Sequence, residues 1–130
     1  MWGYGQEQVH LILESIENQP TTVLTLHFLL DNKKDAPYEI ALLDPDNNTF
    51  VTDAQGVEHA YRSVTEMSEV EPLSLASLSR RRFSISFAPL TTPGDSIALR
   101  ATFKVVARGS LPSEAVRKVE ADNIRLNRSI

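Results

Sequence analysis

Residues 81–107, RRFSISFAPLTTPGDSIALRATFKVVA, contain two runs in which apolar and polar side chains alternate. In the first run Phe83, Ile85 and Phe87 share one side. The second run repeats the pattern with Ile97, Leu99, Ala101, Phe103 and Val105. A period of two is typical of half-buried β-strands. With the Pro- and Gly-bearing turn between them, the two runs predict a hairpin on which an all-β core is assembled.

Similar segments lie outward from this stretch on the N-terminal side. Residues 21–30 alternate with Leu24, Leu26, Phe28 and Leu30 on one side, and shorter runs follow at 38–42, 50–52, 57–61 and 73–75. Turn signals separate them at intervals of roughly 8–12 residues, as in antiparallel sandwiches. The sequence therefore predicts an all-β, antiparallel β-sandwich of seven to nine strands. Its expected core is Leu24, Leu26, Phe28, Ile40, Phe83, Ile85, Phe87, Leu99, Phe103 and Val105.

The secondary structure of three segments is harder to predict. Residues 7–16 carry apolar side chains on both faces, which indicates a strand covered on two sides or one that switches between sheets. The three short runs between residues 38 and 61 suggest a meander at one edge. Residues 114–123 fit a short helix with Val116 and Val119 inward, or an extended arm. The extended interpretation is preferred from Arg117 onward, with Ile124 and Leu126 in a closing strand.

Composition limits the class of protein. The chain of 130 residues, 42% hydrophobic and 23% charged, fits one globular domain spanning residues 1–130. Residues 1–6 either pack over an end of the sandwich through Trp2 and Tyr4 or fray. With 13 basic and 17 acidic residues the net charge is -4, which disfavours a nucleic-acid partner.

Several features are absent from the sequence. It has no cysteine, so disulfides, thiolate zinc sites and a cysteine nucleophile are excluded. No apolar run reaches the roughly 18 residues of a transmembrane segment. The N-terminal residues lack the pattern of a signal sequence. If the protein is exported, we expect this chain to be its mature or trimmed form.

A family resemblance emerges along residues 21–106. Asn32 lies in a turn after a strand, Asp53 and Gly56 form a turn before the aromatic Tyr61, and a strand ending at Phe87 leads to Pro89. This order resembles bacterial immunoglobulin-like domains of secreted antigens and lipoproteins. The sequence departs from that pattern at residues 76–79, Ala-Ser-Leu-Ser, where the family commonly has an Ala-Pro-Gly turn. The resemblance implies that the all-β, antiparallel sandwich is an immunoglobulin-like β-sandwich. It also implies an extracytoplasmic or secreted location and no catalysis.

The best candidate for a ligand site is the set Asp44, Asp46 and Asn48, three oxygen donors at a spacing of two. An EF-hand would also need Gly at its sixth position and Glu at its twelfth, where this chain has Thr49 and Gln55. Asp, Pro and Asn are also the ordinary residues of turns. A calcium site of another type, completed by Asp53, is the alternative. No other cofactor is expected.

Other reactive residues form no recognisable constellation. His10, His27 and His59 lie on different expected strands without zinc-site spacing, and no serine stands in a GxSxG elbow. Arg80, Arg81 and Arg82 invite an anion-binding interpretation. Because neighbouring strand residues point to opposite sides, a solvated turn paired with Glu66, Glu69 or Glu71 is preferred. No enzyme is predicted.

The functional prediction is a non-catalytic interaction or binding module, exposed in the cell envelope or secreted, with a protein as partner. A calcium or small-ligand carrier and an accessory β-domain of a larger envelope protein or enzyme are the alternatives. Binding residues often lie on loops held by a rigid scaffold, which directs attention to residues 44–48 and 63–79.

Overall fold

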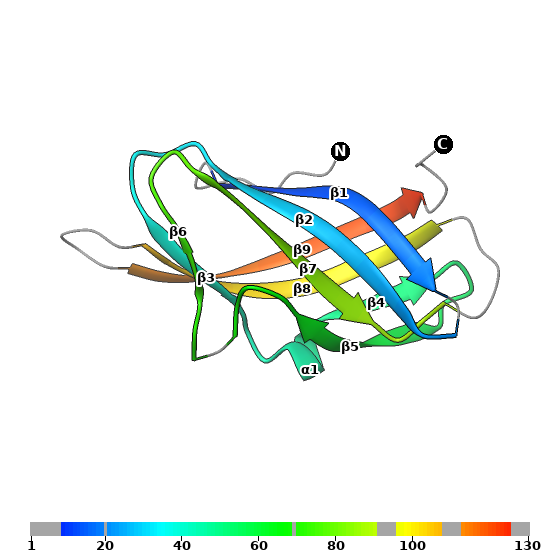
Figure 1. Ribbon diagram of the computed structural model, residues 1–130. Helices are drawn as coiled ribbons and strands as arrows, with labels where there is room; N and C mark the ends of the chain where they lie inside the picture. The colour runs from blue at the N-terminus through cyan, green and yellow to red at the C-terminus, as the bar shows by residue number, and fades with distance from the viewer. Residues whose placement is uncertain (1–8, 20, 69, 91–95, 108–112, 126–130) are drawn as a thin grey trace.

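A computed structural model describes residues 9–19, 21–68, 70–90, 96–107 and 113–125 (Figure 1). The expectations for Trp2, Tyr4, Glu69 and Leu126 lie outside these residues. The elements are β1 (Val9–Gln19), β2 (Val23–Asn32), β3 (Tyr38–Leu42), α1 (Pro45–Asn48), β4 (Phe50–Asp53), β5 (Glu58–Val64), β6 (Leu73–Leu75), β7 (Arg80–Phe87), β8 (Ser96–Ala107) and β9 (Ser113–Arg125). Every pairing between these strands is antiparallel, which confirms the predicted all-β class.

The strands form two layers (Figure 1). In the first layer β2 pairs with β1 and β7, and β7 pairs with the second half of β5. In the second layer β8 pairs with β9 on one side and with β3 and β4 on the other, and β6 extends the layer beyond β3. The first half of β5 pairs with β4, so β5 passes from one layer to the other.

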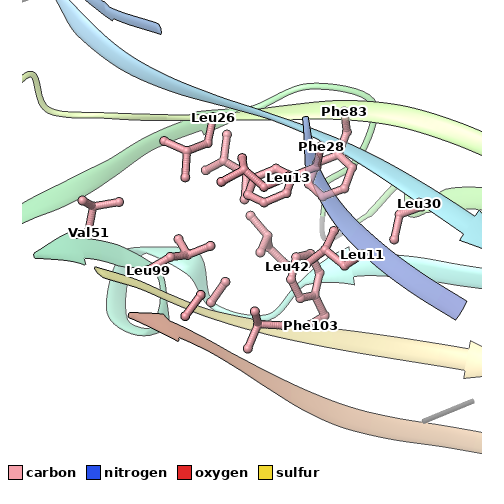
Figure 2. Close-up of a cluster of buried hydrophobic side chains, with 14 of the residues drawn as sticks. Leu11, Leu13, Leu26, Phe28, Leu30, Leu42, Val51, Phe83, Leu99 and Phe103 are labelled. Carbon is pink, nitrogen blue, oxygen red and sulfur yellow. The ribbon is translucent and has the colours of Figure 1, made fainter. Parts of the chain in front are cut away.

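The core fills the space between the layers, as Figure 2 shows for residues such as Leu26 and Phe103. Phe83 stacks on Phe28 with ring centroids 5.2 Å apart and meets Phe103 of the opposite layer edge-on at 6.1 Å. Such contacts add to the free energy gained by burying the rings. The predicted core residues are buried, apart from Val105, which is half-buried.

The predicted hairpin of residues 81–107 is wrong. Its two runs are strands as expected, but β7 pairs with β2 and β5 while β8 pairs with β3, β4 and β9. The connection beginning at Ala88 therefore crosses between layers. Alternation shows which face of a strand is buried and does not show which strand lies beside it. The apolar faces of β7 and β8 meet through Phe83 and Phe103 across the core.

A β-bulge explains why Ile16 of β1 is apolar although simple alternation places it opposite to Leu11 and Leu13. Leu13 is opposite Phe28 and Ser15 is opposite His27, so Glu14 is the extra residue. Because one inserted residue reverses the alternation, Ile16 returns to the core side after Leu13. This part of β1 changes face without changing sheet.

Two further expectations change. The C-terminal segment is the continuous strand β9, so the extended interpretation is confirmed and begins before Arg117. Val119 is buried, while Val116 is 48% exposed. The predicted meander is wrong in part, because β3 and β4 both pair with β8 and only β4 and β5 form a hairpin. Among the described residues, no helix has the length and hydropathy of a membrane span.

Candidate functional site

The chain leaves the second layer briefly between β3 and β4. Both strands lie along β8, and residues 43–49 separate them. Pro45 has no N–H for a ladder hydrogen bond, and Asp44 has a left-handed φ of 43°. These two residues start the single turn of α1 in place of a continued strand. Asn48 holds the turn down by donating from Nδ2 to the Leu43 carbonyl, 3.1 Å away.

This interruption leaves one edge of the second half of β5 with no strand beside it among the described residues. β4 covers residues 58–60 on one side of β5, and β7 covers the other side of the second half. Where β4 would continue along Tyr61–Val64, the chain turns into α1. The gap is a surface hollow of about 490 Å³ lined by Leu42, Asp44, Pro45, Asp46, Tyr61, Arg62, Ser63, Val64, Met67 and Ser68. We call it the α1–β5 hollow.

The hollow brings together the two segments that sequence analysis singled out. Asp44 and Asp46 come from residues 44–48, and Ser63 and Ser68 come from residues 63–79. Sequence analysis missed its apolar lining, Leu42 and Met67, both nearly fully buried. Met67 was detectable as an apolar residue between two glutamates of an acidic loop.

The four predicted calcium ligands are not brought together. Asp44 accepts a hydrogen bond from Asn47 Nδ2 at 2.9 Å, and Asp46 is exposed at the hollow. Asp53 instead lines a separate hollow with Ser96 and Asp122. In the described ranges, no group of three or more His, Cys, Asp or Glu side chains is placed to hold a metal ion.

Asp53 anchors the hairpin between β4 and β5. Its carboxylate lies 2.9 Å from His59 Nε2 and accepts hydrogen bonds from the backbone N–H groups of Gln55 and Val57. The hydrogen bond from His59, and then those from the backbone, lower the pKa of Asp53. His59 Nδ1 lies 3.1 Å from the Pro89 carbonyl, so both ring nitrogens face acceptors. The pair ties the hairpin to the segment after β7.

His27 has a comparable structural position on the outer face of the first layer. Its Nε2 lies 2.8 Å from Glu17 on β1, and its Nδ1 lies 2.7 Å from the Ser84 hydroxyl on β7. The ring therefore connects the strands on either side of β2. His10 lies on β1, so the histidines are spread over three strands.

The three arginines face different acidic partners. Arg81 lies 3.4 Å from Glu66, as expected. Arg80 lies 3.4 Å from Asp31, and Arg82 lies 2.9 Å from Glu14. The pKa of Asp31 is lowered, chiefly by its hydrogen bond with Lys33 and also by the charge of Arg80. Each arginine is thus part of an ion pair at the surface. Only Arg81 has a predicted partner, and all three arginines lie in strand β7 and not in a turn.

The carboxylates at the α1–β5 hollow differ from these. Asp44 and Asp46 have no Lys or Arg partner among the described residues. Among the described residues that line the hollow, Arg62 is the one cation. Its Nη1 donates a hydrogen bond to the Thr22 carbonyl, at the turn between β1 and β2. The hollow therefore combines an apolar base, two carboxylates without an ion pair and a strand edge.

The sequence matches no protein-family model and no curated protein. The structure is similar to a crystal structure described as yeast GGA1_GAE domain-P21, with a TM-score of 0.54 and 16% identity over 90% of this chain and 94% of that one. The GAE domain of GGA2p from Saccharomyces cerevisiae has a TM-score of 0.48 and 12% identity over 95% and 98% of the two chains. A PapD-like domain of human CEP192 has a TM-score of 0.44 and 16% identity over 96% and 91%.

At these identities the likeness concerns the fold alone, and the first of the three structures carries it. The chain is an immunoglobulin-like β-sandwich.

Proposed function

We propose that this protein is a non-catalytic protein-interaction module and that the α1–β5 hollow is its binding site. The observation that carries the proposal is the hollow itself, where residues 44–48 and 63–68 meet beside the half of β5 that β4 does not cover. An open strand edge is a template for another chain. The groups that line the hollow are carboxylates, hydroxyls and a guanidinium, without a nucleophile held by a base.

The location of the interaction is part of the proposal. The resemblance to domains of secreted antigens and lipoproteins supports an extracytoplasmic setting, in the cell envelope or outside the cell. A test is to extract the protein from the native cell by fractionation and to detect it with an antibody. Detection in the cytosol alone would overturn this part and leave the binding site untouched.

The binding site can be tested by selection from a displayed library of random heptapeptides against the whole chain. We expect enriched peptides to perturb the backbone NMR signals of Ser63, Val64 and Ser68 on titration. The variant Ser63→Trp places a large ring at the hollow and is expected to lower affinity about tenfold, which is roughly 1.4 kcal/mol. The matched control is Ser74→Trp, at an exposed position of β6 outside the hollow.

The selection can also contradict the proposal. If no peptide is enriched, or if the perturbed signals map to β1 and β9 instead, the α1–β5 hollow is not the binding site. Equal loss of affinity in Ser63→Trp and Ser74→Trp would have the same meaning, because it would indicate a general effect of the added ring.

A further inference from the structure

We propose that Ser84 is a nucleophilic serine that takes up an acyl group from activated acyl donors such as thioesters, with His27 as its general base and Glu17 as the residue that positions the ring. The three side chains come from neighbouring strands of the first layer, and none of them lines the α1–β5 hollow. The inference therefore goes beyond the proposed binding site and does not depend on it.

The three side chains form a hydrogen-bonded chain on the outer face of the sheet. His27 of β2 is directly opposite Ser84 of β7, and its Nδ1 lies 2.7 Å from the Ser84 hydroxyl oxygen. Its Nε2 lies 2.8 Å from Oε1 of Glu17 on β1. A nucleophile within hydrogen-bond reach of a base, which a third group orients in turn, is the arrangement that activates a serine hydroxyl.

The bulge in β1 brings the carboxylate to this face. Leu11 and Leu13 point into the core, so uninterrupted alternation would direct Glu17 inward as well. The extra residue Glu14 reverses the alternation, and Glu17 is exposed, diagonal to His27 across the β1–β2 pair. Bulges are over-represented beside active sites, where they re-aim a side chain.

The two partners of His27 decide which ring nitrogen acts as the base. A carboxylate only accepts hydrogen bonds, so the neutral ring carries its proton on Nε2 and donates it to Glu17. The lone pair of Nδ1 then faces the Ser84 hydroxyl, which donates to it. His59 also has a carboxylate at Nε2, but its Nδ1 faces the Pro89 carbonyl, which has no proton to give up. Of these two histidines, only His27 is placed to deprotonate a nucleophile.

The proposed reaction is acyl transfer to the serine oxygen. The Ser84 side chain is half-buried and that of His27 is 34% exposed, so a small donor reaches the pair from solvent. Ser84 Oγ forms a bond to the carbonyl carbon of the thioester while its proton passes to His27 Nδ1. The carbon–sulfur bond then breaks, and the sulfur leaves with the electron pair and takes the proton from the ring. Between these steps the charge of Glu17 stabilises the imidazolium.

The backbone at Ser84 limits the donors to reactive ones. The Ser84 N–H donates to Thr65 Oγ1 at 2.8 Å, so it is not free to bind the oxyanion of a tetrahedral intermediate. Loss of one such donor slows acyl transfer about 10²–10³-fold, so amides and ordinary esters should not react. The acyl-serine is itself an ordinary ester. We therefore expect it to persist, which makes the reaction a modification of the protein and not a catalytic cycle.

Ser86 is a matched control on the same face of β7. It is half-buried like Ser84, but the side chain beside its hydroxyl is Thr25, at 3.3 Å, instead of a histidine. The whole chain is incubated with p-nitrophenyl acetate or with phenyl thioacetate, and acetylation of each serine is followed by peptide mass spectrometry. We expect Ser84 to react about a hundredfold faster than Ser86, because a positioned general base contributes about 10²–10⁴-fold. Equal rates at the two serines, or no acetylation of Ser84, would overturn the proposal.

The roles of His27 and Glu17 have separate readouts, with the Ser86 rate as internal reference, because unfolding would change both serine rates together. His27→Ala should lower the Ser84 rate to that of Ser86, and added imidazole should restore part of it, which a purely structural role of the ring does not predict. Glu17→Gln keeps an acceptor for Nε2 but removes the charge, so Ser84 should react about tenfold more slowly. An unchanged Ser84 rate in His27→Ala overturns the assignment of the base, and an unchanged rate in Glu17→Gln overturns the positioning role.

Release of p-nitrophenolate distinguishes modification from turnover. The quantity to measure is the difference in release between wild type and Ser84→Ala, which removes the contribution of other nucleophiles on the protein. A difference that reaches a single equivalent per chain and stays there supports the inference. A difference that keeps growing would overturn the proposed modification, and it would also contradict the non-catalytic part of the proposed function.

Discussion

The two open sides of the sandwich differ in what they present to solvent. On the side of β1 and β9 the layers close on a crevice of about 30 Å³, room for little more than a water molecule. On the side of β5 the hollow is about 490 Å³. Both sides end in strand edges, yet only the second combines its edge with open volume and carboxylates that lack an ion pair.

The difference lies in how each edge is protected. On β9, Arg117 is half-buried at the crevice, and the outward charges form ion pairs such as Lys104 with Glu114. On β1, the bulge at Glu14 bends the edge. Inward charges and bulges are the usual means by which proteins prevent unwanted strand pairing. The second half of β5 also has a bulge, near Arg62, and on the side away from β7 it faces α1.

The largest expected effect on stability comes from replacing a buried aromatic residue in the core next to either side. Phe87 is opposite Tyr61 of β5, and Phe103 is opposite Arg117 of β9. Either change, Phe87→Ala or Phe103→Ala, is expected to cost about 3–5 kcal/mol of unfolding free energy, measured in urea. Val57→Ala, at a residue 52% exposed, is the control and should change stability by less than about 0.5 kcal/mol. A Phe variant as stable as wild type would contradict the core assignment.

A smaller effect should follow from removing the inward charge of β9. Arg117→Val is expected to promote strand pairing between copies at the β1–β9 side. The association constant for self-association, measured by sedimentation, should rise about tenfold, which is roughly 1.4 kcal/mol. Lys118→Val, on an exposed neighbour that faces the other way, is the control. If both variants remain monomeric, Arg117 does not protect this edge and the contrast between the two sides rests on volume alone.

The pH dependence of stability tests the anchor beside the hollow. The pKa of Asp53 is lowered in the folded protein, so its contribution is present above the ordinary value of 3.8 and is lost as pH falls through the lower folded value. Asp53→Asn should therefore be less stable than wild type at pH 6, and the gap should narrow below about pH 4. Urea unfolding at pH 6, 4 and 3 measures this. If the difference in unfolding free energy between wild type and Asp53→Asn is the same at all three pH values, the charge of the carboxylate contributes nothing to stability.

The smallest expected effect is that of calcium. The hypothesis of a site formed by Asp44, Asp46, Asn48 and Asp53 predicts stabilisation on binding. Because Asp53 lies in a different hollow, we expect millimolar calcium to leave the melting temperature unchanged. If calcium raises the melting temperature of the wild type but not that of Asp46→Asn, the calcium hypothesis would be supported and the α1–β5 hollow would be a cation site. A rise that survives in that variant would place the ion elsewhere.

Much of the fold was predictable because alternation reports burial. Leu24, Leu26 and Phe28 were assigned inward and are buried. The partner of each strand was not predictable, as β7 and β8 illustrate, because their faces look the same in a hairpin and across a core. Residues 114–123 were ambiguous because Val116 and Val119 are three apart, as on a helix face, while the inward Ala115 and Arg117 are weak signals of a strand.

The candidate site was predictable only in parts. Asp44 and Pro45 mark a turn by their chemistry, and sequence analysis singled out that turn and the loop after Arg62. Their meeting depends on β3 and β4 both pairing with β8, a long-range arrangement that no local pattern encodes. That Asp53 lines a different hollow could not be predicted for the same reason.

Because β5 belongs to both layers, neither layer can separate without breaking the pairing of a single short strand. A sandwich of two independent sheets could lose one sheet first. Here the loss of β5 would remove support from β4 and β7 together, so the two layers should open as one cooperative unit. In amide hydrogen exchange, Leu26 of the first layer and Leu99 of the second should then approach the same opening free energy, that of global unfolding.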